Sequence, residues 1–302
     1  MADPVIIEAA VNGLTRKEQS SHVPVDPGEI ADDALACLDA GAAVVHNHID
    51  MFGVDGAIAA DRYLEGWSPV LDARPDALFY PTTNAGRDVA SSYAHIAPLA
   101  ERGGLRLSLV DPGSVNLGGL GPDGLPGPGF VYVNSYEDAR HQFDLCATYR
   151  LGPSIAIFEP GFLRTALAWA AAGKLPAGAM VKLYFSGDHG TLAGFGLRPT
   201  ARALDAYLEL LEGTGVPWAV AVLGGDVVEC GLARLAIERG GHLRVGLEDH
   251  AGPDGTAPPN NAELVAAAAA LCREVGREPA TPEDAARLLH LPERTAVRRS
   301  VR

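Results

Sequence analysis

Five side chains in two short segments have the residue types needed to bind a metal ion and move a proton. In AAVVHNHID, His46 and His48 end an apolar run, and their spacing of two places both imidazoles on one face of a strand. In HLRVGLEDH, the same spacing pattern puts Arg244 and Glu248 on one face, and Asp249 follows. Two imidazoles and one carboxylate with an open position are typical of catalytic zinc, with non-haem iron as the alternative. We therefore predict Zn²⁺, or another divalent metal, on His46, His48 and Glu248.

Each of these residues also has a structural interpretation. The two histidines, taken alone, fit packed or hydrogen-bonded side chains. Arg244 and Glu248 could form an ion pair that only closes a sheet, although the joint presence of the histidines favours a metal site. Asp249 fits two roles equally well, a general base held near Arg244 or the cap of the following turn.

These residues must be positioned by an alternating pattern of elements that runs along the whole chain. Short runs rich in Val, Ile, Leu and Phe predict eight strands, at 5–11, 42–49, 77–83, 105–111, 154–160, 180–186, 218–223 and 242–249. Amphipathic segments between them predict eight helices, at 27–40, 59–72, 88–102, 136–150, 161–173, 199–213, 227–239 and 261–275. The helix at 27–40 has clear ends, because Asp26 can cap it, Pro27 suits its first position and Gly41 can close it.

Eight strand-helix units with nearly continuous apolar strands predict an α/β protein of the (β/α)8 TIM-barrel class, with an open doubly wound sheet as the alternative. The 302 residues suit a single domain of this kind. A short extra helix is expected at 281–289, capped by Thr281, before a basic tail at 293–302. In a closed barrel the last strand neighbours the first and lies two positions from the second, so Glu248 can reach the two histidines.

Polar residues end many of the predicted strands, as expected where the loops of a barrel surround one mouth. Thr82, Asp111 and Ser186 are candidates for substrate binding, although each is about as well explained as a turn former. Other polar residues at strand ends are Thr83, Asn84, Glu159, Asp188 and His189.

Glu8 lies inside the first apolar strand, where an unpaired carboxylate would be costly. It could bind a substrate ammonium, act as a base or form a buried pair with Arg244, and the sequence does not choose. Asn12 shares its face and is a further candidate for substrate binding.

The glycine-rich stretch LGGLGPDGLPGPG contains a nominal G-x-G-x-x-G at Gly119, Gly121 and Gly124. A dinucleotide site is not expected, because that motif needs a helix to begin at the turn and the prolines keep this segment extended. We predict that 119–129 is a long loop, either a flexible flap over the mouth or part of a subunit contact.

Composition excludes several classes of partner. A formal net charge of −14 disfavours nucleic acid and anionic lipid surfaces, which bind through excess Lys and Arg. The N-terminal apolar run is too short for a signal peptide or a membrane span, so a cytoplasmic protein is expected. The four cysteines are far apart and fit buried free thiols better than a zinc site.

The chain resembles the β-keto acid cleavage enzymes, the family first described through 3-keto-5-aminohexanoate cleavage. The resemblance runs from Pro4 to about Leu291, through AAVNG, VPVDPGEIADDALACLDAGAAVVHNH, GSVNLG, GGHLRVGLEDH, NNAELV and REPATPEDAARLL. It implies an oligomeric TIM barrel, a dimer or tetramer, with zinc on His46, His48 and Glu248. It also implies that Arg244 and Asp249 abstract a proton from a β-keto acid, which then reacts with acetyl-CoA to give acetoacetate and a new acyl-CoA.

Departures from the family pattern lie around the expected substrate. Glu8 and Asp111 add carboxylates, and Gly225 stands where an arginine often follows the strand-seven glycine. The gain of carboxylates and the loss of an arginine suit a substrate with cationic character or an amine. Two alternatives to the reaction remain at this stage: a metal-dependent aldolase or hydrolase that needs no CoA, and a non-catalytic ligand-binding barrel.

Overall fold

The computed structural model describes residues 3–103, 105–188, 194–252 and 259–293, in which strands and helices alternate. The strands are β1 (Ile7–Ala10), β2 (Val44–Asn47), β3 (Leu78–Pro81), β4 (Leu107–Val110), β5 (Val115–Leu120), β6 (Pro126–Tyr132), β7 (Gly152–Ile157), β8 (Met180–Ser186), β9 (Trp218–Leu223) and β10 (His242–Val245). The helices are α1 (Pro27–Ala40), α2 (Gly56–Ala73), α3 (Val89–Ser92), α4 (Ile96–Gly103), α5 (Tyr136–Tyr149), α6 (Pro160–Ala171), α7 (Ala201–Leu211), α8 (Leu232–Glu238), α9 (Asn261–Val275) and α10 (Pro282–Leu288).

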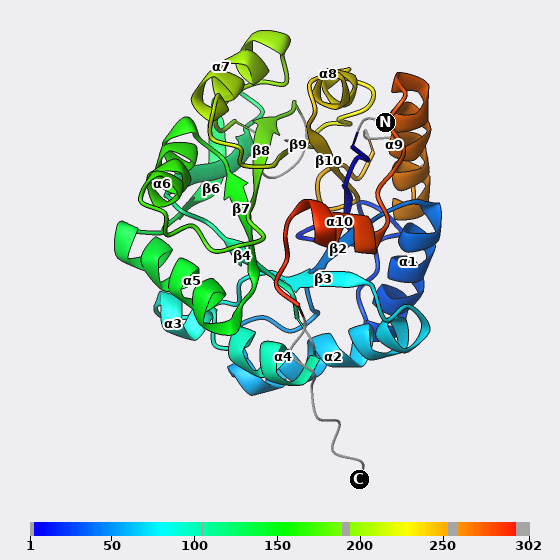
Figure 1. Ribbon diagram of the computed structural model, residues 1–302, viewed down its shortest axis with the longest axis vertical. Coiled ribbons are helices and arrows are strands. Elements are labelled where there is room, and N and C mark those ends of the chain that lie inside the picture. The colour runs from blue at the N-terminus through cyan, green and yellow to red at the C-terminus, as the bar shows by residue number, and fades with distance from the viewer. Residues whose placement is uncertain (1–2, 104, 189–193, 253–258, 294–302) are drawn as a thin grey trace.

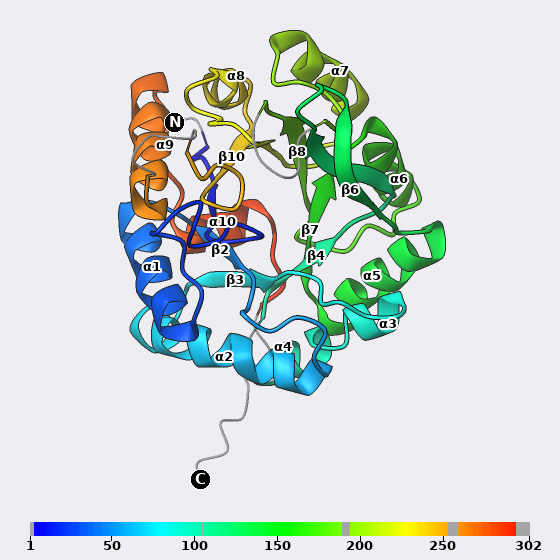
Figure 2. The ribbon, with the colours of Figure 1, turned by 180° about the vertical axis from the view of Figure 1, so that it is seen from behind.

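Eight of the strands form one parallel sheet in the order β3-β2-β1-β10-β9-β8-β7-β4. Its two end strands, β3 and β4, pack against each other, so the sheet curls into a nearly closed barrel. Figure 1 shows the strands at the centre with the helices around them, and Figure 2 shows the same ring from behind. The predicted TIM barrel is therefore confirmed, and the doubly wound alternative is wrong.

The ends of α1 form as the sequence predicts. The Asp26 side chain accepts a hydrogen bond from the Glu29 backbone at 2.9 Å, and Gly41 ends the helix in the left-handed region with φ 117°. The predicted extra helix is α10, where the Thr281 side chain caps the Asp284 backbone. Most of the predicted basic tail lies outside the described residues.

One predicted helix is divided in two. The segment 88–102 contains α3 and α4, separated at Tyr93 to His95. Pro98 explains the break, because it has no backbone N–H and in one continuous helix its ring would clash with the carbonyl of Ala94. With the restart at Ile96, Pro98 falls in the first turn of α4, where proline is tolerated.

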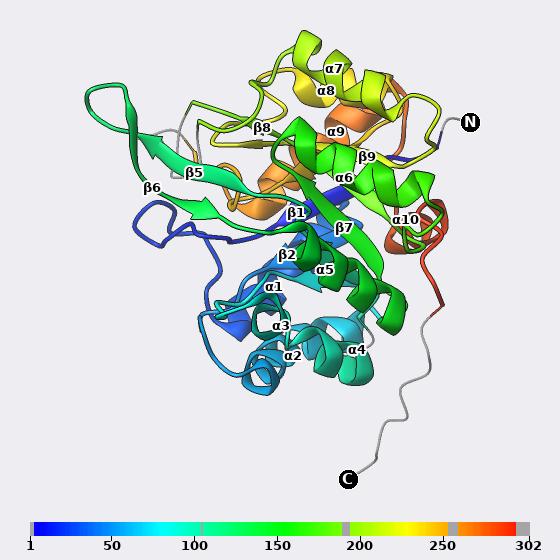
Figure 3. The same ribbon diagram turned by 90° about the vertical axis from the view of Figure 1, so that its left-hand side faces the viewer.

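The stretch after β4 is not a structureless loop. β5 and β6 pair as an antiparallel hairpin, with Val115 opposite Tyr132, and Figure 3 shows it projecting from the barrel. Proline is tolerated in β6 because each hairpin strand has only one neighbour, so its other edge needs no donor. A strand, and not a helix, follows the glycine-rich turn, in agreement with the rejected dinucleotide motif.

No helix among the described residues is both long enough and apolar enough to cross a lipid bilayer.

Candidate active site

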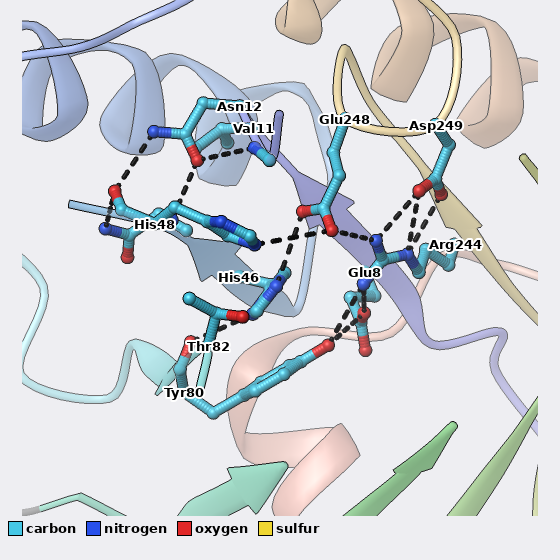
Figure 4. A network of polar contacts seen from close by, with 12 residues as sticks. Glu8, Val11, Asn12, His46, His48, Tyr80, Thr82, Arg244, Glu248 and Asp249 are labelled. Carbon is cyan, nitrogen blue, oxygen red and sulfur yellow. Dashed lines mark hydrogen bonds and ion pairs between the residues drawn. The ribbon is translucent and has the colours of Figure 1, made fainter. Parts of the chain in front are cut away.

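His46, His48 and Glu248 come together at the C-terminal end of the barrel (Figure 4). His46 lies in β2, His48 directly follows it, and Glu248 lies in the turn after β10. The Nε2 atoms of His46 and His48 are 3.3 and 3.5 Å from the two Glu248 carboxylate oxygens. One ligand atom from each residue lies within 4.8 Å of the others, as a shared metal ion requires.

The position of Glu248 does not follow from strand periodicity, contrary to our prediction of a strand to residue 249. β10 ends at Val245, and the chain turns at Gly246 with φ 142°. A Cβ atom at Gly246 would lie 2.1 Å from the Ala10 carbonyl oxygen, so this close approach of two backbones needs glycine. The Glu248 backbone N–H then donates to that carbonyl at 3.1 Å, which fixes the turn beside β1.

The two imidazoles are oriented by groups outside the metal cluster. Nδ1 of His46 hydrogen-bonds the Tyr80 carbonyl at 3.2 Å, which directs Nε2 toward Glu248, and the Tyr80 ring stacks on the imidazole. Asn12 accepts from the His48 N–H at 2.8 Å and donates to the His48 carbonyl at 3.1 Å. Asn12, predicted to bind substrate, thus holds the backbone of a metal-ligand candidate.

The donor set fits a divalent metal ion. Burial lowers the pKa of His46 to about 4 despite the opposing effect of Glu248, so the imidazole is neutral at pH 7 and its lone pair can bind metal. Nε2 of His48 and Oε2 of Glu248 are buried and have no hydrogen-bonding partner among the described residues. Such atoms are costly unless a ligand satisfies them.

Arg244 and Asp249 form a two-pronged ion pair next to this cluster. Nε of Arg244 donates to one Asp249 oxygen at 2.9 Å, and Nη2 donates to the other at 2.8 Å. Nη2 also lies 3.0 Å from Glu248, so Arg244 joins both carboxylates and does more than pair with one. Burial raises the pKa of Asp249 to about 6, although Arg244 opposes the rise. A carboxylate with such a pKa is suited to accept a proton near neutral pH.

Glu8 forms a buried ion pair with Arg244, one of the three alternatives that its sequence position left open. Its side chain is fully buried, and Oε1 accepts from Arg244 Nη1 at 3.1 Å and from the Tyr80 hydroxyl at 2.5 Å. Lys182 of β8 lies 3.4 Å from the same oxygen. Lys182 and Tyr80 were not among the predicted site residues, although Lys182, like Glu8, is a charged residue inside an apolar strand.

The other predicted substrate-binding residues lie at strand ends, as expected, but most hold neighbouring groups. Asp111 accepts from the Tyr132 hydroxyl of the hairpin at 2.6 Å, and burial raises its pKa. Ser186 accepts from the Gly194 backbone N–H at 2.7 Å. Thr82 lines a hollow of about 250 Å³ with His48. His189 lies outside the described residues.

A second hollow, of about 300 Å³, lies on the other side of the site. It is lined by Arg244, Asp249 and His250, by Gly225, and by apolar residues of β9, β10 and α9. The candidate proton acceptor and the metal-ligand candidate His48 therefore each border a hollow.

Comparison with known proteins identifies the family. Residues 4–291 match the sequence profile of the β-keto acid cleavage enzymes. This chain belongs to that family. A 3-oxoadipate:acetyl-CoA acetyltransferase of Cupriavidus necator is 30% identical over 97% of this chain and 96% of the relative. A 3-keto-5-aminohexanoate cleavage enzyme of Fusobacterium nucleatum is 27% identical over 96% of this chain and 99% of the relative.

Membership makes the chain an enzyme of the β-keto acid cleavage class, so the non-catalytic barrel is not retained. Among solved structures, ObcA in a ternary complex with a C4-CoA adduct and oxalate has a TM-score of 0.64 at 16% identity, covering 89% of this chain and 68% of that chain. At this identity the likeness supports the TIM-barrel fold alone.

Proposed function

We propose that the enzyme cleaves a β-keto acid with acetyl-CoA in a reaction that depends on zinc. The α-carbon loses a proton and forms a bond to the acetyl carbonyl carbon, and the acetyl thioester bond breaks to release the CoA thiolate. The thiolate then forms a bond to the keto carbon, the bond between the keto carbon and the α-carbon breaks, and the proton returns to the α-carbon. The products are acetoacetate and the CoA thioester of the remaining acyl group. The observation that carries this proposal is the junction of His46, His48 and Glu248 with the Arg244–Asp249 pair, in a member of this family.

His46, His48 and Glu248 would hold the ion. Zn²⁺ bound there would polarise the keto oxygen and stabilise negative charge on it. Asp249 accepts the α-proton, and Arg244 keeps this carboxylate oriented through two parallel hydrogen bonds. We further propose that Thr82, Asp111 and Ser186 border the substrate, and that Glu8 and Asn12 act on the site through Arg244 and His48.

The test is a substrate panel with metal analysis. The purified protein is assayed for acetoacetate with 3-oxoadipate, 3-keto-5-aminohexanoate and other β-keto acids, with and without acetyl-CoA, and bound metal is measured. We expect about one zinc per chain and acetoacetate only when acetyl-CoA is present. Turnover without acetyl-CoA would favour an aldolase or hydrolase, and no acetoacetate from any acid would overturn the proposal.

We also propose a homo-oligomer, a dimer or tetramer, in which the β5–β6 hairpin contacts a second copy. The hairpin region exposes large apolar side chains, Leu125, Phe130, Val131, Val133 and Tyr136, and exposed apolar clusters are typical of protein contacts. Sedimentation of Val131→Glu should show smaller particles than the unmodified protein. Ile58→Glu, on α2, is the matched control, because Ile58 is also an exposed apolar side chain, 50% exposed against 59% for Val131.

A further inference from the structure

A buried lysine lies below the active site, and hydrogen bonds of the described residues connect it to Arg244 through Glu8 and Tyr80. Lys182 and Glu8 are both fully buried inside the barrel, with 3.4 Å between Nζ and Oε1. The described contacts of Lys182 are with Glu8, Tyr80 and the ring face of Tyr184. Burying two charges is expensive, and an apolar pair of similar volume is often at least as stable. Stability therefore does not explain why this barrel contains them.

The hydrogen bonds around Tyr80 connect this lysine to Arg244. The Tyr80 hydroxyl accepts from Lys182 at 2.5 Å and from Arg244 Nη1 at 3.3 Å, and it donates to Glu8 at 2.5 Å. Glu8 Oε1 accepts from the same Nη1 at 3.1 Å. Two oxygens thus fix one end of the guanidinium. Because its donors form a rigid planar fork, fixing Nη1 also fixes the direction of Nε and Nη2.

The charges around Arg244 indicate what Lys182 contributes to the site. Three carboxylates, those of Glu8, Glu248 and Asp249, lie within 3.1 Å of the guanidinium nitrogens. With one cation for three anions, Glu8 would compete with Asp249 for the guanidinium. Lys182 supplies a second cation that contacts Glu8 alone among the three. The guanidinium can then keep Nε and Nη2 on Asp249, with Nη2 also 3.0 Å from Glu248.

We propose that Lys182, acting through Glu8 and Tyr80, is a positioning residue that sets the orientation of Arg244 toward Asp249. Its catalytic consequence rests on the proposed function, in which Asp249 accepts the proton. The orientation of Arg244 does not depend on the proposed function, so the orientation and the reaction can be tested separately.

The first test measures Arg244 directly in the full-length protein. With ¹⁵N-labelled arginine, the Nε–H signal of Arg244, assigned by its loss in Arg244→Lys, should be shifted and protected from exchange by its Asp249 partner. Lys182→Met should move this signal and speed its exchange at least tenfold. Tyr80→Phe removes one oxygen without changing charge, so it should fold even where Lys182→Met does not, and it should move the signal in the same direction.

The second test separates positioning from general destabilisation. Lys182→Met should lower kcat at least tenfold while KM changes less than threefold. Arg277→Met is the matched control, because Arg277 is also a buried cation but bonds the backbone carbonyls of Ile237 in α8 and of Gly241, which precedes β10. It should lower the melting temperature without moving the Arg244 signal or kcat.

An unchanged Arg244 signal in both Lys182→Met and Tyr80→Phe would overturn the inference, whatever the activity. A moved signal in a protein whose unmodified form cleaves no β-keto acid would support the inference and reject only the proposed reaction.

Discussion

At the scale of single residues, neighbouring carboxylates of the site have different partners. Glu248 faces the two imidazoles, whereas Asp249 is held by two hydrogen bonds from Arg244. In a strand these adjacent residues would point to opposite faces, but they lie in a turn, so both can also contact Arg244. In the proposed reaction, this arrangement would let Glu248 serve as a metal ligand while Asp249 accepts a proton.

Replacing the proposed proton acceptor should abolish turnover without removing the metal. In Asp249→Asn we expect kcat to fall roughly 10²–10⁴-fold, the usual contribution of a positioned base, with metal content unchanged. Steady-state kinetics and metal analysis on the same sample check this. Asp226→Asn is the control, because Asp226 lines the same hollow but caps the backbone of Val228. A loss in Asp249→Asn no larger than in the control would contradict the assignment.

At the scale of elements, two turns that meet at the mouth place Glu248. One is the turn at Gly246, and the other follows β1 at Gly13, which has φ 54°. A Cβ atom at Gly13 would lie 2.1 Å from Cγ of Glu248, so the absence of a side chain there makes room for the carboxylate.

Gly13→Ala should therefore weaken metal binding. The new methyl group must displace Glu248, and we expect the Kd for Zn²⁺ to rise at least about tenfold, in the range found for disturbed ligand positioning. Competition titration with a chelating dye measures this. Gly173→Ala is the matched control, with φ 65° and nothing within 4 Å of the added Cβ, so it introduces the same backbone strain alone. Equal Kd values in the two variants would show that Gly13 does not position the ligand.

The packing of α1 against α9 contains a carboxylate whose ionisation opposes folding. Burial raises the pKa of Asp33 from 3.8 to about 6, against the hydrogen bond that Asn261 donates to it at 2.7 Å. The folded state therefore binds the proton more tightly than the unfolded state. The resulting loss of stability develops as the pH rises from about 4 to 6 and is constant above that.

Asp33→Asn should consequently stabilise the protein at pH 7.5, by at most about 3 kcal/mol, and make no difference below pH 4. Urea unfolding at the two pH values measures the change. Asp32→Asn, an exposed neighbour on the same helix, should have no such effect. A destabilised Asp33→Asn protein at pH 7.5 would mean that the ionised carboxylate is favourable in the folded state.

At the scale of the whole molecule, the candidate metal ligands connect distant parts of the chain. His46 lies in β2, His48 follows that strand, and the turn after β10 supplies Glu248. In the sheet, β1 lies between β2 and β10. An ion shared by these segments would bind the closed barrel and not the unfolded chain. Metal binding should therefore stabilise the entire fold.

Removing the metal should lower the melting temperature reversibly. At free Zn²⁺ about 1,000-fold above Kd, the stabilisation is about 4 kcal/mol, which corresponds to several degrees. Calorimetry with chelator and after adding Zn²⁺ back checks this. His48→Ala should lose the response, and His22→Ala, at an exposed site, should keep it. A melting temperature that changes neither with chelator nor with added Zn²⁺ would contradict the proposed metal site.

The sequence by itself determined the features that depend on neighbours along the chain. The apolar runs fixed the number of barrel strands, Asp26 and Thr281 marked the starts of α1 and α10, and the spacing of His46 and His48 put them at the same strand end. These features persist because periodicity and capping act over a few residues.

Only the tertiary structure decided the features that depend on contacts between distant residues. The turn at Gly246 is set by the Ala10 carbonyl, more than 200 residues away, and the pairing of Glu8 with Lys182 exists only because the barrel closes. The β5–β6 hairpin likewise depends on pairing across its own turn. Local propensity cannot specify such contacts, because their free energy appears only when the segments meet.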